Sequence, residues 1–415
     1  MTPTLTRLTE LAGSWNTALD REIPAAIQLR HVLHGAPCVS GAEHPTRERI
    51  AKALRGVMRF EPIVDAGGVS RIGPSEGPAI AVRTELDALP VTELSGAPFA
   101  ATNGAMHACG HDVHQAALVA LARAAAGLDL PLGLVALLQP REESYPSGAL
   151  EIVNAGVLER FDVAHVIGAH VHPGVRNAAV ASGAGFINSA ADEIEIQVHG
   201  RGGHAAYPHE AADTIAAIAQ IAVAIPEVIR RTVSPLRPAI ISIGTLTAGE
   251  GAANVLPAEA RIYATMRTTD PTDRQPLFDA IRDMAERVAA AYGTDADVTR
   301  IEGEPALIND AALATGVDDW LARLGVDGAE PMRSLGADDF SYYCAAVPSL
   351  MMFVGVETLD RSPQPSLHDP RFLPDDSAVG AVARALLAGY LAATERVLSV
   401  EHHRSDLTAR DHVGA

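Results

Sequence analysis

The chain has 415 residues, of which 48% are hydrophobic and 20% are charged, and its formal net charge is −19. This composition is typical of a soluble globular protein, and the length exceeds what one hydrophobic core usually organises, so we expect two domains. The acidic balance argues against nucleic acid and against an anionic membrane surface as partners.

The cysteines and the N-terminus predict a cytoplasmic protein. Cys38, Cys109 and Cys344 are widely spaced and cannot all pair, which disfavours a disulfide framework. The first seven residues are polar and no signal-type apolar core follows them. No uninterrupted apolar run reaches membrane-spanning length, so we expect no membrane segment.

The first part of the chain alternates helical and strand patterns. Apolar spacing of three and four predicts a helix over residues 5–33, with a break at Pro24. Thr46 is expected to cap a second helix. Further helices are expected after residue 112 and over 148–156. Buried strands are predicted over residues 62–72, 79–85, 132–138 and 163–171. This alternation predicts an α/β domain.

Acids and histidines follow three of these strands where they end. Chemistry in open α/β sheets collects at the carboxyl ends of strands, so these side chains are candidates for function and Asp87 is counted as a candidate catalytic residue. Of two adjacent carboxylates, one can bind a metal while the other accepts a proton. The alternative is a set of charged, solvated turns. The side chains concerned are Glu85, Asp87, Glu142, Glu143, His170 and His172.

The densest group of metal-ligating side chains lies in residues 105–114. It contains three histidines, Cys109 and Asp112. Thiolate, imidazole and carboxylate groups this close together suit a transition metal. Gly110 allows the backbone to bend so that Cys109 and His111 can reach one point. A helix start with a buried thiol and surface histidines is the alternative.

The pattern changes near residues 182–188 and predicts a second, inserted domain. Residues 194–199 alternate between apolar and polar, as in a half-solvated antiparallel strand. The order strand, helix, strand, strand, helix, strand predicts a small α+β sandwich of ferredoxin-like type. Asp213 is expected to cap its first helix. A glycine-rich turn over residues 200–209 carries His204 and His209.

From about residue 306 the first pattern returns. Asn309 is expected to cap a helix, a strand is predicted over 349–354 and a closing helix over 376–399. The polar tail is expected to be disordered. The predicted organisation is a discontinuous catalytic metal-binding domain over residues 1–186 and 305–400, an inserted domain over 187–304, and a tail over 401–415.

The sequence resembles the aminoacylase/carboxypeptidase superfamily of di-metal amidohydrolases, in the branch with hippurate hydrolase and the indole-3-acetyl-amino-acid hydrolases. The resemblance extends from roughly residue 30 to residue 390. It rests on Leu86-Asp87-Ala88-Leu89-Pro90, Met106-His107-Ala108-Cys109-Gly110-His111-Asp112, Gln139-Pro140 with Glu142-Glu143, Gly202-Gly203-His204-Ala205-Ala206 with Pro208-His209, Asp339-Phe340-Ser341 and Leu367-His368.

The resemblance implies a mixed-sheet catalytic domain that holds two divalent ions of zinc, manganese, cobalt or nickel per subunit, with an inserted lid or dimerisation domain. Glu142 would be the general base. His204 would reach the scissile carbonyl, often from a partner subunit. Substrate contacts would come from Asn254, Arg267 and His209. The implied metal ligands are Cys109, His111, Glu143, His170 and His368.

The implied activity is cleavage of the amide bond of N-acyl amino acids, such as hippurate-like compounds, by a homodimer or a dimer-based homo-oligomer. The alternatives are a metallo-dipeptidase or carboxypeptidase on the same fold, a cysteine hydrolase that uses Cys109, and a non-catalytic binding protein. The chain departs from the family pattern without losing a ligand. The departures are Glu85, Arg141, Asp338 and Cys38.

Overall fold

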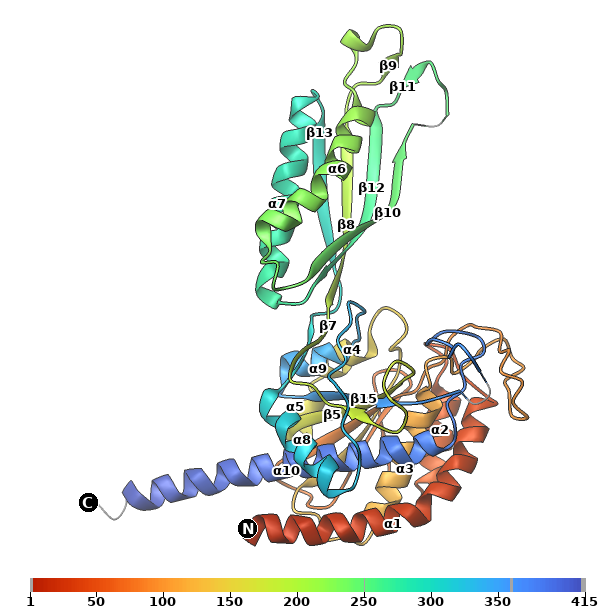
Figure 1. The fold of residues 1–415 in the computed structure, drawn as a ribbon, viewed down its shortest axis with the longest axis vertical. Helices are drawn as coiled ribbons and strands as arrows, with labels where there is room; N and C mark the ends of the chain where they lie inside the picture. Colours follow the sequence, from red (N-terminus) through yellow and green to blue (C-terminus); the bar gives the residue numbers. More distant parts are fainter. Residues whose placement is uncertain (1–2, 250, 359–360, 412–415) are drawn as a thin grey trace. The chain divides into compact units, whose positions relative to one another are not determined.

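The computed structural model describes residues 3–249, 251–358 and 361–411, with side chains described from residue 4 to residue 400. The chain divides into two compact units (Figure 1). Unit 1 comprises Met1–Gly185, Ile308–Met332 and Tyr342–Ala415, and unit 2 comprises Phe186–Leu307 and Arg333–Ser341.

The segment Arg333–Ser341 groups with unit 2, although the sequence suggested that it belongs to the catalytic domain. The reason is main-chain hydrogen bonding. Ser334 N donates to Ile187 O at 2.8 Å, and Ser189 N donates to Gly336 O at 3.0 Å.

Unit 1 contains a seven-stranded mixed sheet in the order β1-β2-β4-β3-β5-β15-β6. Strands β4, β3, β5 and β15 are parallel neighbours, and the outer pairs are antiparallel. Both β3 and β4 are buried along their whole length. The continuous apolar run of β4 predicted its burial, whereas β3 starts apolar and ends in the buried polar residues Arg83, Thr84 and Glu85. The strands are β1 (Glu61–Ile63), β2 (Gly67–Ile72), β3 (Ala79–Glu85), β4 (Gly133–Gln139), β5 (Val163–His172), β6 (Val180–Ala181) and β15 (Leu350–Gly355).

Three long helices of unit 1, α1, α3 and α10, pack on one another. The rings of Trp15 on α1 and Tyr390 on α10 meet edge to face with centroids 5.1 Å apart, and each ring donates to a backbone carbonyl. The helices are α1 (Pro3–His34), α2 (His44–Ala53), α3 (His111–Ala125), α4 (Gly148–Asn154), α5 (Val157–Arg160), α8 (Ala311–Arg323), α9 (Ser341–Ala346) and α10 (Ser377–Asp411).

Within the described residues, one helical stretch, Ser377–Val400 of α10, is long and apolar enough by composition to cross a membrane. Most of its residues are buried inside the protein. The stretch is therefore packed as a core helix of unit 1.

Several predicted element ends differ from the structure. Helix α1 continues through Pro24, whose exposed ring costs the helix a backbone donor without a clash in the core. Helix α2 begins at His44, before Thr46. Helix α8 is capped by Asp310, which accepts from two backbone amides, while Asn309 ends a strand. Helix α10 continues to Asp411 where a disordered tail was expected, and residues 412–415 lie outside the described residues.

Unit 2 is an antiparallel four-stranded sheet in the order β10-β12-β8-β13, with helices α6 and α7 on one face. This is the predicted ferredoxin-like arrangement. Asp213 caps α6 as predicted, because its carboxylate accepts from Ala216 N at 2.9 Å. The elements are β8 (Ala190–His199), β9 (Gly203–His204), η1 (Pro208–Glu210), α6 (Thr214–Thr232), β10 (Ala239–Ala248), β11 (Val255–Leu256), β12 (Glu259–Thr268), α7 (Pro271–Ala291) and β13 (Asp295–Glu302). The chain enters and leaves unit 2 through β7 (Gly185–Asn188) and β14 (Leu307–Asn309).

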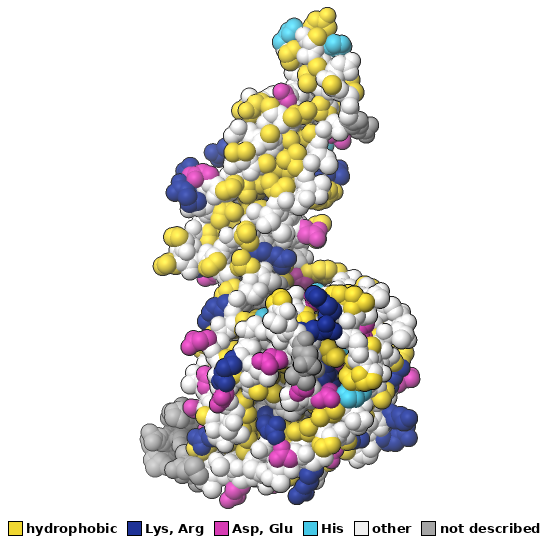
Figure 2. Space-filling model, turned by 45° about the vertical axis from the view of Figure 1, so that its right-hand side comes forward, with side chains coloured by type: hydrophobic (Ala, Val, Ile, Leu, Met, Phe, Trp, Pro, Cys, Tyr) yellow, Lys and Arg dark blue, Asp and Glu magenta, His cyan; other side chains and the backbone are white. Residues whose placement is uncertain are grey.

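Strand β10 forms one edge of the unit 2 sheet, and it exposes several large apolar side chains. Ile240, Ile243 and Leu246 on β10 are exposed, as is Val223 on the neighbouring helix α6, whose exposed fraction is 73%. Figure 2 shows hydrophobic side chains gathered along this part of unit 2. We call the group Ile240, Ile243, Leu246 and Val223 the β10 edge.

Candidate active site

Cys109 lies in the turn that leads into α3, and Gly110 shapes this turn. Gly110 caps α3 with φ +82°, in the left-handed region. A Cβ atom at this position would meet Val171 Cγ2 at 2.4 Å, so the turn requires glycine both for its conformation and for its packing. The Cys109 thiol, as a result, lies 3.5 Å from His170 Nε2.

His111, the first residue of α3, has a defined orientation. Its Nδ1 lies 2.9 Å from the carbonyl oxygen of Asp87 and donates to it, so Nε2 is the nitrogen available to a metal. That Nε2 is buried and has no hydrogen-bond partner among the described residues. Burial opposes protonation of His111, but the carboxylates of Glu85, Asp87 and Glu143 outweigh it and raise the pKa.

His170 is oriented by the same kind of contact. Its Nδ1 donates to Val171 O at 2.7 Å and leaves Nε2 facing Cys109. Burial holds the pKa of His170 well below its usual value, so the imidazole is neutral, which a metal ligand requires.

His368 reaches the same place from a loop. Its backbone has φ +67°, an uncommon conformation for a residue with a Cβ atom, and its N–H donates to Ala108 O at 2.9 Å. The strained turn brings His368 Nε2 to 3.4 Å from Glu143 Oε1.

Glu142 and Glu143 follow β4 and point to different partners. Glu142 Oε2 lies 3.8 Å from His111 Nε2. Glu143 Oε1, together with Cys109 Sγ and a ring nitrogen of His111, belongs to a group of ligand atoms that lie within 4.8 Å of one another. The structure thus brings together all five side chains that the sequence suggested as ligands, with the suggested base beside them.

Asp87 contacts the backbone of this site. One carboxylate oxygen, Oδ2, accepts from Ser40 Oγ at 2.7 Å and from Glu143 N at 2.9 Å. Its carbonyl accepts from His111. Asp87 therefore orients Glu143 and His111, and neither Ser40 nor this bridging function could be read from the sequence.

The electrostatics of the donors fit a bound cation. Burial, and then the carboxylates of Glu143 and Glu142, raise the pKa of the Cys109 thiol well above its usual value. A metal ion reverses this effect, because a coordinating thiol is deprotonated outright. Two buried ligand atoms, His111 Nε2 and Glu143 Oε1, make no hydrogen bond within the described part of the chain. The donor set of thiolate, imidazoles and carboxylate is that of a transition-metal site.

Arg141, a departure from the family pattern, anchors the loop that carries the two glutamates. Its guanidinium contacts Glu151, Asp65 Oδ2 at 2.5 Å and Pro146 O at 3.1 Å. Its N–H donates to the buried Glu43 at 2.9 Å. Arg141 also has φ +48°, a conformation that these contacts hold in place. The Arg141 side chain therefore stabilises the loop that carries Glu142 and Glu143.

The remaining suggested residues lie in unit 2. His204 is exposed on β9, and Ala205 N donates to Asn254 O at 3.0 Å, so His204 and Asn254 lie at the same end of unit 2. Arg267 is half-buried on β12, where it pairs with Ala191 and Ile240. It lies near the C-terminal end of β12, whereas His204 and Asn254 adjoin the N-terminal end. His209 is exposed, with its Nε2 3.9 Å from Glu210.

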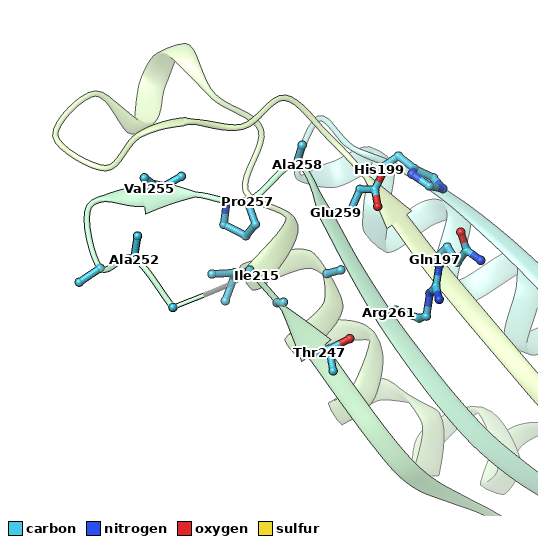
Figure 3. A pocket seen from close by; sticks show the side chains of 15 residues that line it. Gln197, His199, Ile215, Thr247, Ala252, Val255, Pro257, Ala258, Glu259 and Arg261 are labelled. Atoms are coloured by element: carbon cyan, nitrogen blue, oxygen red, sulfur yellow. The ribbon is translucent and has the colours of Figure 1, made fainter.

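A cavity of about 1110 Å³ lies in unit 2 beside the segment that leads into β11. Figure 3 shows Val255 and Pro257 on one side of it and His199, Glu259 and Arg261 on the other. All of its lining residues belong to unit 2 and none is a candidate ligand or the candidate base. Its size therefore does not make it the site of the chemistry.

The mixed sheet, with a buried cluster of thiolate, imidazole and carboxylate donors at its strand ends, defines a metal-dependent hydrolase. Residues 81–388 match the model of Peptidase family M20/M25/M40, and the chain belongs to this family. It is accordingly an enzyme that hydrolyses linear amide C–N bonds.

Relatives of known name agree with this assignment. The chain is 34% identical over 359 residues to N-acetyl-L-cysteine deacetylase of Bacillus subtilis, covering 85% of this chain and 84% of that protein. It is 33% identical over 374 residues to thermostable carboxypeptidase 2 of Saccharolobus solfataricus, with 87% and 94% covered. Among solved structures, it resembles the YXEP protein of Bacillus subtilis, a dinuclear metal-binding peptidase of the M20 family, with a TM-score of 0.79, 28% identity, and 91% and 99% of the chains covered.

Proposed function

We propose that this protein is an amidohydrolase with two divalent metal ions, which cleaves N-acyl amino acids to a carboxylic acid and a free amino acid. The observation that carries the proposal is the convergence of Cys109, His111 and Glu143 within 4.8 Å, with Glu142 beside His111. His170 and His368 complete the donor set. Zinc, manganese, cobalt and nickel all suit such ligands.

When bound, the metal ions would supply a water of lowered pKa and positive charge near the scissile carbonyl. The Glu142 carboxylate accepts a proton from the attacking water as the water oxygen bonds to the scissile carbonyl carbon, and it gives that proton to the amine nitrogen as the C–N bond breaks. The Asp87 carboxylate accepts a hydrogen bond from the backbone N–H of Glu143, and the Asp87 carbonyl accepts one from Nδ1 of His111. Asp87 thereby orients both residues. His204 donates a hydrogen bond to the oxygen on which negative charge develops. Asn254, Arg267 and His209 bind the substrate carboxylate end.

A cysteine hydrolase is the less favoured mechanism. A nucleophilic cysteine needs a lowered pKa, which neighbouring cations or a charged histidine supply. Here burial and carboxylates raise the pKa of Cys109, and burial keeps His170 neutral. These surroundings suit a metal-bound thiolate and oppose a free one.

The substrate class is drawn from two kinds of relative. One relative is a deacetylase of N-acetyl-L-cysteine and another is a carboxypeptidase. Both reactions cleave an amide bond whose nitrogen belongs to an amino acid with a free carboxylate. We therefore propose N-acyl amino acids, including hippurate-like compounds, as the substrates. A dipeptidase or carboxypeptidase activity is the second candidate.

We further propose a homodimer, formed through the β10 edge. An exposed edge strand presents unpaired N–H and C=O groups, and an antiparallel second copy of β10 would continue the sheet across a two-fold axis. The same pairing would cover Ile240, Leu246 and Val223.

A dimer would also explain how His204 and Arg267, which lie at opposite ends of unit 2, can both contact one substrate. Arg267 is eight residues along β12 from Glu259, which corresponds to roughly 26 Å. Strands β9 and β11 lie beyond the Glu259 end of β12 (Figure 1). His204 belongs to β9, and Asn254 directly precedes β11. One small substrate cannot contact both ends of unit 2 of one chain, so we propose that His204 and Asn254 serve the site of the partner subunit.

We propose a cytoplasmic location, because the site depends on a reduced Cys109 thiolate. Thiols persist in the reducing cytoplasm and are oxidised or paired in oxidising compartments. Cys109 and Cys38 are free thiols in the structure.

The test is an activity panel on chelator-stripped enzyme. The apoenzyme receives zinc, manganese, cobalt or nickel. It is then assayed with N-acyl amino acids and with unblocked dipeptides that have the same C-terminal amino acid. We expect activity only with metal and higher kcat/KM for the N-acyl series. Full activity after stripping would contradict the metal-dependent mechanism, and a preference for unblocked dipeptides would favour the peptidase.

A further inference from the structure

The central sheet opens at the candidate site. Strands β3 and β5 are paired in parallel only from Ala79 to Val82 and from Val163 to Ile167. Both strands nevertheless continue, β3 to Glu85 and β5 to His172. The strands therefore separate just before the ends that carry Glu85 and His170, and the backbone groups of β5 there need other partners.

His114 fills this gap. It lies on the first turn of α3, three residues after His111, so both rings lie on the same face of the helix. Val171 N donates to His114 Nε2 at 2.9 Å, in place of a ladder partner from β3. The His114 ring also packs against the ring of His170, with centroids 4.6 Å apart. His114 thus holds both the backbone and the side chain of the segment that presents His170.

Glu85 determines which nitrogen of His114 carries the proton. Glu85 Oε2 lies 2.9 Å from His114 Nδ1, which therefore donates, leaving Nε2 as the acceptor for Val171 N. The Glu85 carboxylate is itself held by Arg83. Arg83 Nε donates to Gln139 Oε1 at 2.7 Å. This chain of contacts is buried throughout, from β4 across β3 to β5.

Glu85, His111, His114 and His170 have ligand atoms within 4.8 Å of one another, so they could be mistaken for a second metal site. Both nitrogens of His114 are already used, one as a donor and one as an acceptor. A metal on either nitrogen would leave the buried Glu85 or the Val171 N–H without its partner, which is costly. His114 is therefore not a ligand.

We propose that His114 is a positioning residue, which acts with Glu85 to hold β5 away from β3 and to orient His170 toward Cys109. The inference rests on the proposed metal centre and extends it to a residue that the sequence analysis gave no role. Partners that orient a metal ligand typically contribute about 10–100-fold to metal affinity.

Three variants test the proposal. His114→Phe keeps the ring but loses both hydrogen bonds, and His114→Gln keeps an acceptor and a donor. The matched control is His165→Phe, because His165 is also a buried histidine of β5 but bonds to Pro348 O at 2.7 Å, away from the site. Each apoprotein is titrated with Co²⁺ against a competing chelator, and the visible bands of the Co²⁺ complex are recorded.

We expect His114→Phe to bind Co²⁺ about 10–100-fold more weakly, with shifted visible bands. His114→Gln should recover most of the affinity and the wild-type spectrum, and His165→Phe should match wild type in both. If His114→Phe fails to fold by circular dichroism, His114→Leu takes its place with the same expectation.

Three results would overturn the inference. Wild-type affinity and bands in the folded apolar variant would make His114 a bystander. Loss of one Co²⁺ equivalent in His114→Gln would make it a ligand. Equal losses in His165→Phe would make the effect one of general packing. Absence of Co²⁺ binding by the wild-type protein would instead contradict the metal centre itself, so the two failures are distinguishable.

Discussion

The Oε2 atom of Glu142 lies 3.8 Å from the Nε2 atom of His111. The nitrogen is the one that faces the candidate metal centre, because the other ring nitrogen donates to Asp87 O. Glu142 is thus adjacent to the donor cluster while its neighbour Glu143 belongs to that cluster, an arrangement that supports the proposed roles of Glu142 as base and Glu143 as ligand.

Glu142→Gln should retain metal and lose turnover, because the amide is nearly the same size but cannot accept the proton. General acid–base catalysis contributes about 10²–10⁴-fold, and kcat should fall by that range. Steady-state kinetics and metal analysis by mass spectrometry measure the two effects. A variant with full kcat would remove Glu142 from the role of base.

Cys109→Ser should bind metal more weakly, because a serine hydroxyl is a poor anionic ligand near neutral pH. Metal content after dialysis against a mild chelator measures the effect. Cys38→Ser is the matched control, since Cys38 is a half-buried thiol outside the donor cluster. Equal metal retention in both variants would show that the Cys109 sulfur has only a packing role.

His204→Ala should lower kcat without releasing metal, because it removes an interaction made mainly in the transition state. Mixing it with Glu142→Gln distinguishes the two subunit arrangements. If His204 serves the partner's site, randomly exchanged dimers regain activity in about one quarter of their sites. Mixtures that stay as inactive as the separate variants would assign His204 to its own subunit or to no site.

Arg141→Ala should lower both kcat and metal affinity, because the loop of Glu142 and Glu143 loses its clamp to Asp65 and Pro146. Misplacement of catalytic groups by about 1 Å can cost about 10²-fold in rate. Arg71→Ala is the control, since Arg71 likewise donates to loop carbonyls, including Pro74 O at 2.7 Å. An Arg71→Ala variant with the same kinetic loss would indicate a general loss of stability.

His34 should make the stability of unit 1 depend on pH. Its Nδ1 and Nε2 each lie 3.0 Å from a carboxylate, of Asp112 and Glu93, so both nitrogens donate and the ring is charged. Burial opposes this charge, but the two carboxylates outweigh it and raise the pKa to about 9. Because the folded pKa is above the unfolded value, the stabilisation is fully present below about pH 6.5 and is lost as the pH rises through 9.

The shift corresponds to a contribution on the order of 3 kcal/mol at most, from about 1.4 kcal/mol per pKa unit. Thermal unfolding midpoints of wild type and His34→Gln at pH 6, 7.5 and 9 measure it. The gap between the two proteins should be widest at pH 6 and should shrink toward pH 9. A gap that is constant or that widens with pH would show that His34 is neutral in the folded protein.

The sequence pattern predicted the two kinds of architecture, and the resemblance to a known family implied the candidate donors that the structure brings together. The buried strand over 132–138 could be predicted because a short continuous apolar run is typical of a strand buried on both faces. Cys109 and His111 could be identified as candidate ligands because such side chains seldom cluster by chance. The order of strands and helices in unit 2 was sufficient to predict its ferredoxin-like arrangement.

Other features depended on contacts between residues far apart in the chain. The function of Arg141 depends on Asp65 and Glu151, and that of His114 depends on where β3 and β5 separate. Pro24 does not break α1 because its ring faces solvent along a helix held by packing. Local patterns specify which groups are available, whereas hydrogen-bond partners and packing are set by tertiary structure, and these decide which nitrogen, oxygen or backbone amide each group meets.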